Sequence, residues 1–222
     1  MTHRQEPSET LRAADGRVPG RRGRATRERL LDATAAMLET TSWRDLKVVD
    51  IAREAGTSPA TFYQYFPEVE TAIQVLAERA ADEGHVLAED VLDGRWSGRS
   101  GFERATALVD AFLGFWDDHT ALIRLIDLHI AEGDPRFREI RNHLLGPVTE
   151  ALGDLIGKLK ADGRHPAEVQ PVAHAAALVS MLAHVAEHHA GLETWGVEHD
   201  ALRRSLARLV FAGVTGRRPP DS

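Results

Sequence analysis

Residues 57–66 read TSPATFYQYF and directly follow DIAREAG at residues 50–56. Gly56 stands where a left-handed residue is expected to end a helix. Ser58 and Pro59 then match the N-cap and the first position of a new helix. Two short helices joined by a tight turn that contains glycine form a helix-turn-helix. These residues therefore predict a helix-turn-helix in the N-terminal part of the chain.

The second of these two helices is predicted to have an inner and an outer face. Phe62 and Phe66 are four residues apart, so we expect both to anchor the helix inward. The remaining surface is predicted to carry Ala60, Thr61, Gln64 and Tyr65, with Tyr63 at the flank. Glutamine pairs with adenine in the major groove, methyl groups contact the thymine methyl, and hydroxyl groups contact phosphates. The alternative is that both tyrosines belong to the core.

Charge is distributed unevenly along a chain whose formal net charge is −7. Residues 17–67 hold nine basic and six acidic side chains, whereas residues 68–222 hold sixteen basic and twenty-five acidic ones. Residues 17–67 are thus weakly basic and residues 68–222 are acidic, which predicts that any polyanion binds to residues 17–67.

An arginine-rich segment precedes the first predicted helix, with six arginines and one glutamate in residues 17–29. Residues 1–24 are predicted to form a disordered basic arm. Arg21, Arg22 and Arg24 would enter the minor groove or lie along phosphates. The alternative is a tail that only increases solubility.

Composition excludes several classes of protein. The chain has no cysteine, which rules out disulfides and thiolate metal sites. It has no apolar run near the roughly 20 residues that a membrane span needs. The polar N-terminus lacks the apolar region of a secretory signal, so we expect a cytoplasmic protein with no membrane segment.

Apolar residues recur at helical spacing, and sustained period-two alternation is absent. The sequence therefore predicts an all-α protein of about nine helices: an N-terminal three-helix helix-turn-helix DNA-binding domain over residues 25–68 and a C-terminal helical bundle over residues 69–218. The later helices of the bundle are expected at about residues 102–118, 120–131, 135–161, 168–190 and 199–214.

Residues 26–76 resemble the DNA-binding domain of the tetracycline-repressor (TetR) family of transcriptional regulators. The resemblance rests on DIAREAG, a short gap, TFYQYF and a following proline. It implies three DNA-binding helices and a C-terminal domain for ligand binding and dimerisation. It further implies DNA contacts by Lys47, Val48, Val49, Ser58, Ala60, Thr61, Tyr63, Gln64 and Tyr65. Val69 departs from the family pattern, because many members place a phosphate-binding lysine there.

The resemblance implies a homodimeric repressor that a small hydrophobic or aromatic ligand releases from a palindromic operator. The expected partners are double-stranded DNA, an effector of unknown identity, and a second copy bound through the last two helices. We expect neither a cofactor nor an enzyme activity. An enzyme on a helical bundle and a helical adaptor remain as alternatives, but no nucleophile–base spacing, phosphate loop or carboxylate pair supports catalysis.

Candidate ligand-binding residues are apolar or aromatic and lie in the predicted bundle. They are Phe112, Phe115, Trp116, Leu125, His129, Met181 and His184. Each of them could equally belong to a packed core. His184 and His188 have a spacing that can bind Zn²⁺, but no H-E-x-x-H motif surrounds them, so no metal site is predicted.

Overall fold

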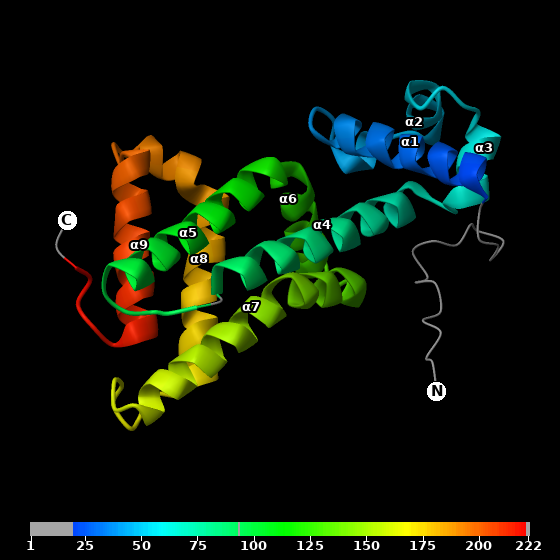
Figure 1. The fold of residues 1–222 in the computed structure, drawn as a ribbon. Coiled ribbons are helices and arrows are strands. Elements are labelled where there is room, and N and C mark those ends of the chain that lie inside the picture. The colour runs from blue at the N-terminus through cyan, green and yellow to red at the C-terminus, as the bar shows by residue number, and fades with distance from the viewer. Residues whose placement is uncertain (1–19, 93, 221–222) are drawn as a thin grey trace, which may run out of the picture. The chain divides into compact units, whose positions relative to one another are not determined.

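The computed structural model describes residues 20–92 and 94–220 of the chain. In this part the chain forms α-helices and one short 3₁₀ helix, with no β-strand (Figure 1). The elements are α1 (Arg21–Leu38), η2 (Trp43–Asp45), α2 (Val48–Glu54), α3 (Pro59–Tyr65), α4 (Val69–Leu92), α5 (Gly98–Asp118), α6 (Thr120–Ala131), α7 (Pro135–Ala161), α8 (Pro171–Glu193) and α9 (His199–Thr215). The predicted all-α class is confirmed. None of the described helices is both long and apolar enough to cross a membrane.

The chain divides into two compact units. We call residues 20–79 together with 121–137 the head unit, and residues 80–120 together with 138–220 the body unit. The boundary predicted from the sequence is a single one, after residue 68. The structure differs, because the first half of α4 and all of α6 except its first residue belong to the head unit.

The core of the head unit is built from α1, α2 and α3, which contact one another in every pair. The large fully buried side chains of this core are Leu30, Leu31, Ile51, Phe62 and, at the C-cap of α3, Phe66. Burying one such side chain contributes about 1.5–3 kcal/mol, so these few residues supply much of the stability of a small three-helix unit.

An ion pair joins the first half of α4 to α1. Arg79 donates two hydrogen bonds to the Glu28 carboxylate, at 2.6 and 2.8 Å. These hydrogen bonds hold the pKa of Glu28 below its usual value and raise the pKa of Arg79. Both side chains are about half exposed, so solvent screening keeps the contribution to stability small.

The end of α6 and the start of α7 pack on η2. The His129 ring stacks on Phe137 with centroids 4.1 Å apart and lies 4.8 Å from the Trp43 ring. Arg44 forms an ion pair with Glu132 beside them. These contacts explain why residues 121–137 belong to the head unit, which their place in the sequence does not indicate.

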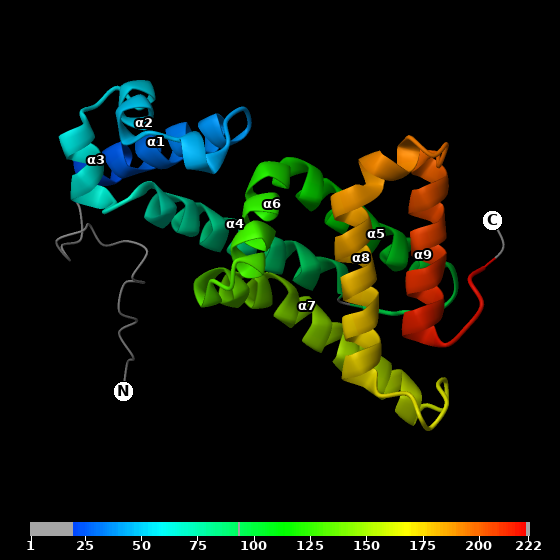
Figure 2. The ribbon, with the colours of Figure 1, turned by 180° about the vertical axis from the view of Figure 1, so that it is seen from behind.

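In the body unit, α5 contacts both α8 and α9, and α8 and α9 contact each other. Figure 2 shows α8 in orange and α9 in red side by side. The buried stripe of α5 includes Leu108, Val109, Phe112 and Trp116. Its spacing of three and four residues is that of an amphipathic helix whose apolar face covers its neighbours.

Candidate nucleic-acid interface and effector cavity

The turn between α2 and α3 has the geometry that the sequence predicted. Gly56 has φ 64°, a left-handed conformation that L side chains rarely adopt. The Gly56 N–H donates to the Arg53 carbonyl at 3.1 Å, and the Thr57 N–H donates to the Ala52 carbonyl at 2.8 Å. This pair of bonds is the Schellman motif, which satisfies carbonyls that the helix end leaves free.

The start of α3 is capped by a side chain. The Ser58 hydroxyl oxygen accepts a hydrogen bond from the Thr61 N–H at 3.2 Å, and Pro59 follows at the first helical position. The Ser58 and Thr61 hydroxyls lie 2.9 Å apart. Ser58 is therefore the N-cap of α3, as the sequence predicts. Its hydroxyl oxygen caps the helix, and the DNA contact expected of this residue would come in addition to that cap.

The inner face of α3 is formed by the two predicted anchors. Phe62 and Phe66 are fully buried, and their ring centroids lie 5.5 Å apart. The Arg27 guanidinium lies 5.1 Å from the Phe66 centroid, and its burial lowers the pKa of Arg27. These contacts hold α3 on the head core, which fixes the direction in which its outer side chains point.

The outer face of α3 carries the other predicted residues. Tyr63 is 53% exposed, so the alternative in which both tyrosines are core residues is not supported. Ala60 and Gln64 are exposed, and Thr61 and Tyr65 are half-buried. A phenol, an amide and a methyl group on one short helix form a surface that can contact phosphates and read base edges.

The start of α2 adds a second group of accessible side chains. Lys47 is the exposed N-cap residue, Val48 is half-buried, and Val49 is 58% exposed. A solvent-facing valine contributes nothing to the core, and its methyl groups suit a contact with the thymine methyl. Val69, the first residue of α4, is half-buried.

The three candidate arginines of the arm lie in a helix. Arg21, Arg22 and Arg24 are exposed residues of the first turn of α1, whose N-cap is Gly20. The prediction of a disordered arm through residue 24 therefore needs correction for these positions, and residues 1–19 lie outside the described part. Arginine is a good helix former and glycine is an accepted N-cap, so α1 begins at Arg21, before its first buried residue, Arg27.

A cavity lies within the body unit between α5, α7 and one residue of α4. Its lining residues are Gly84, Leu108, Ala111, Phe112, Phe115, Trp116, Leu144, Leu145 and Val148. Its free volume is about 20 Å³, which is room for about one water molecule, so a larger ligand would require the lining side chains to move. Every lining residue is apolar or aromatic, as expected of a site for a hydrophobic ligand.

Among the residues that line the cavity, Trp116 alone has a side chain with a polar atom. Its ring stacks on Phe112 with centroids 5.4 Å apart, and the Arg141 guanidinium lies 5.7 Å from its centroid. The Trp116 Nε1 atom is buried and has no hydrogen-bond partner in the described part of the chain. A buried N–H without an acceptor is costly, which a bound molecule carrying an acceptor would relieve.

Gly84 allows α4 to approach this site closely. A Cβ atom at this position would lie 2.4 Å from Leu144 Cδ1 and 3.1 Å from Phe115 Cζ. Any larger residue would therefore displace two side chains that line the cavity.

The structure brings together only some of the predicted ligand-binding residues. Phe112, Phe115 and Trp116 line the cavity, whereas Leu125, His129, Met181 and His184 are not among its lining residues. Leu125 and His129 are buried in the head unit, where His129 fills the space beside Trp43 and Phe137. Met181 is half-buried and His184 is exposed on α8.

Sequence reasoning missed the contribution of α7 to the cavity. Leu144 and Val148 have the spacing of ordinary core residues, and a core side chain has the same pattern as one that lines a cavity. Gly84 carried no signal either, because an isolated glycine within a helical pattern has many explanations.

Comparison with known proteins assigns both parts of the chain. Residues 30–68 match the model of the bacterial regulatory proteins, tetR family. Residues 87–221, more than half of the chain, match the tetracyclin repressor-like C-terminal domain. A similar curated protein is the HTH-type transcriptional regulator EthR of Mycolicibacterium smegmatis, 29% identical over 161 residues that cover 70% of each chain.

Solved structures show the same fold. The fatty acid degradation regulator FadR from Bacillus halodurans aligns with a TM-score of 0.64 at 16% identity and covers 92% of this chain and 100% of its own. FadR from Bacillus subtilis in complex with stearoyl-CoA aligns with a TM-score of 0.64 at 14% identity and covers 84% of this chain and 98% of its own. The helix-turn-helix of the head unit, the helical body and the two matching models lead to one conclusion: this chain belongs to the TetR family of DNA-binding transcriptional regulators.

Proposed function

We propose that this regulator is a homodimeric repressor that leaves a palindromic operator when a small hydrophobic or aromatic molecule occupies the cavity of the body unit. The observation that carries the proposal is the outer face of α3, where Tyr63 and Gln64 are exposed above the buried anchors Phe62 and Phe66. Exposed aromatic and amide groups have no role in the core of the head unit, whereas base edges and phosphates are suitable partners for them.

The outer residues of α3 and α2 divide into two roles in this proposal. Gln64 and the methyl groups of Ala60 and Val49 contact base edges. Lys47, Tyr63 and the α1 arginines contact phosphates. Because phosphate contacts carry no sequence information, the two groups are distinguishable by experiment.

Replacing Gln64 should change sequence preference, whereas replacing Arg22 should not. We expect Gln64→Ala to cost about 1–3 kcal/mol on the operator and to reduce discrimination at one base pair of each half-site. We expect Arg22→Ala to weaken operator and random duplexes by similar factors and to reduce the salt slope by about one for each lost phosphate contact.

Fluorescence anisotropy with a fluorescein-labelled duplex, titrated over a salt series, measures both quantities. Glu39→Ala, an exposed change at the other end of α1, is a suitable control. If the Gln64 and Arg22 variants lost affinity for all sequences equally, the assignment of Gln64 to base recognition would be wrong.

A second copy is proposed to pack on α8 and α9. The exposed or half-exposed residues of α8 include Ala173, Ala177 and Ser180, which repeat at helical spacing and permit close approach of another helix. Val172 and Leu209 are more than half exposed on α8 and α9. Two helices from each chain would form a four-helix interface with two-fold symmetry. The two head units of the dimer would then bind half-sites that lie one or more duplex turns of about 34–36 Å apart.

The effector proposed for this cavity is apolar and carries a hydrogen-bond acceptor. The apolar lining favours hydrocarbon or aromatic surface, and the Trp116 N–H requires an acceptor. Acyl compounds, among them the stearoyl-CoA named for FadR from Bacillus subtilis, combine both features, as do aryl ketones and esters.

Removing the Trp116 N–H should remove the preference for an acceptor. We expect aryl ketones or acyl esters to raise the melting temperature of the native chain more than hydrocarbons of matched size. In Trp116→Phe we expect this difference to disappear, because a hydrogen bond of about 1–1.5 kcal/mol is lost while the aromatic surface is kept. Thermal shift measures the effect, and Trp195→Phe, at an 81% exposed tryptophan, is the matched control.

The whole proposal is tested by binding to DNA taken from beside the gene. The dimer should bind one duplex from this region far more tightly than a scrambled duplex, and a compound that raises the melting temperature should release it. Equal binding of the protein to both duplexes at physiological salt would contradict the proposal.

A further inference from the structure

The C-terminal half of α8 carries a group of metal-ligating side chains that neither DNA binding nor the cavity uses. Residues 184–188 read HVAEH, with histidine, glutamate and histidine at positions i, i+3 and i+4. This is the inverted order of the H-E-x-x-H zinc motif, H-x-x-E-H, which also places two imidazoles and a carboxylate on one helix face. The H-E-x-x-H order is absent here, which is why no metal site is predicted from the sequence, whereas the inverted order is present.

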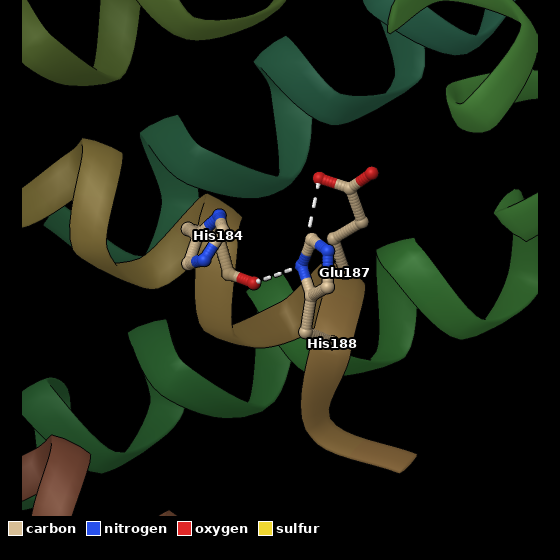
Figure 3. A group of neighbouring side chains, drawn as sticks. All are labelled: His184, Glu187 and His188. Atoms are coloured by element: carbon tan, nitrogen blue, oxygen red, sulfur yellow. Dashed lines mark hydrogen bonds and ion pairs between the residues drawn. The ribbon is translucent and has the colours of Figure 1, made fainter. Parts of the chain in front are cut away.

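The three side chains gather at one place on α8 (Figure 3). One ligand atom from each of His184, Glu187 and His188 lies within 4.8 Å of the others. The two imidazole centroids are 4.4 Å apart, and their planes are tilted by 33°. We propose that these three residues form a site for a divalent transition metal ion, with Zn²⁺ as the ion that suits them best.

The donor distances are close to those that a bound ion requires. With Zn–N and Zn–O bonds of about 2.0–2.2 Å, two donors on one tetrahedral Zn²⁺ lie about 3.4 Å apart. The donor atoms, which lie within 4.8 Å of one another, therefore need to approach by up to about 1.4 Å. Both imidazoles are exposed, so rotation about their side-chain torsions can supply this movement without disturbing the core.

The hydrogen bond of His188 prepares it to bind a metal. Its Nδ1 lies 3.0 Å from the His184 carbonyl oxygen, and because a carbonyl only accepts, Nδ1 carries the proton (Figure 3). The lone pair of the neutral ring is then on Nε2. A backbone carbonyl that holds the other ring nitrogen is the usual outer partner of a metal-binding histidine.

The chemistry of the donors selects the class of ion. Imidazoles suit Zn²⁺, Cu²⁺ and Ni²⁺, whereas Ca²⁺ and Mg²⁺ prefer sites built only from oxygen ligands. The Glu187 carboxylate supplies negative charge. Its oxygen lies 3.8 Å from the protonated His188 Nδ1, so the side chain must turn toward Nε2 to share an ion with that nitrogen. Three protein ligands leave at least one coordination position for water or another ligand.

The neighbouring histidine is engaged elsewhere and serves as a matched control. His189 Nδ1 donates to the Ala186 carbonyl at 2.9 Å, and its Nε2 lies 3.3 Å from Asp117 Oδ1. Both of its nitrogens therefore have partners within the body unit. By contrast, the His184 ring makes neither a hydrogen bond nor an ion pair within the described residues. His184 and His188 continue the helical spacing of Ala173, Ala177 and Ser180, so the site lies on the face of α8 on which a second copy is proposed to pack. Metal binding is therefore measured separately from the oligomeric state.

Zinc titration of the full chain, stripped of metal with a chelator and dialysed, tests the proposal. Competition with a chromogenic chelator should show one Zn²⁺ bound per chain. Because loss of an outer partner already costs about 10- to 100-fold in affinity, loss of either histidine ligand should cost more than about 100-fold and Glu187→Gln about 10-fold. The variants are His184→Ala, His188→Ala, Glu187→Gln and the control His189→Gln, which should keep the native affinity.

Two further measurements separate a ligand role from a structural one. Far-UV circular dichroism and the melting temperature in chelator should be the same for the native chain and for the double variant His184→Ala/His188→Ala, since both side chains are exposed. Added Zn²⁺ should raise the melting temperature of the native chain alone, because only the native chain binds the ion in its folded state. The proposal is overturned if the native chain takes up no Zn²⁺, or if the double variant takes up Zn²⁺ with native affinity and stoichiometry.

Discussion

Phe62→Ala is expected to lower the free energy of unfolding of the head unit by about 3–5 kcal/mol, the usual cost of truncating a fully buried phenylalanine. Phe62 is fully buried and packs on Phe66 and on the core of α1 and α2. A domain is stable by only about 5–15 kcal/mol, so this loss removes a large share of the stability, and a head unit at the low end of that range would be partly unfolded. Operator binding should fall in proportion to the folded fraction of the head unit.

Tyr63→Ala is the matched control, because it removes an aromatic ring from the next residue of the same helix. Tyr63 is more than half exposed and makes only an edge contact with Phe62, at 5.9 Å between centroids. Its removal should cost about 1 kcal/mol or less in stability. DNA affinity should nevertheless fall, since a phosphate contact is lost.

Urea unfolding followed by circular dichroism measures the stability of both variants, and anisotropy measures DNA binding. The expected pattern is a loss of stability for Phe62→Ala and a loss of affinity with a preserved fold for Tyr63→Ala. The opposite pattern would mean that α3 presents its other face to the core.

Ala177→Glu is expected to separate the proposed dimer and to weaken operator binding by at least about 100-fold, because a single head keeps only half of the contacts. Ala177 is exposed on α8, so a glutamate there meets water in the isolated chain and leaves the fold intact. Against a second copy the same carboxylate would be buried without a partner, which costs several kcal/mol.

Ala151→Glu introduces the same charge at an exposed position of α7 and should leave both the dimer and DNA binding unchanged. Light scattering after size-exclusion chromatography gives the mass of each variant. A native chain that is monomeric at micromolar concentration, or an Ala177→Glu variant that remains dimeric, would show that this face of α8 is not the interface.

The helix-turn-helix illustrates how far local sequence signals reach. Gly56, Ser58 and Pro59 each act on backbone groups within four residues, so their roles could be predicted from the chain itself. The spacing of Phe62 and Phe66 likewise determined which face of α3 is buried. The helical pattern of α5 indicated Phe112, Phe115 and Trp116 as a group, and all three line the cavity.

The tertiary structure decided what these local signals could not. Residues 21–24 are helical because they continue α1 beyond the part of the helix that packs in the head unit. His129 is a packing residue of the head unit because its ring contacts Trp43 and Phe137. The ion pairs Arg79–Glu28 and Arg44–Glu132 join residues 51 and 88 positions apart.

The sequence by itself determined the helical class, the helix-turn-helix and its two faces, because helix caps, glycine turns and side-chain spacing act within one or two helical turns. Only the tertiary structure decided which apolar residues enclose a cavity, and that α6 packs with the head unit. Those outcomes depend on which distant side chains meet, and an apolar residue carries the same local pattern whether it faces a packed neighbour or an empty space.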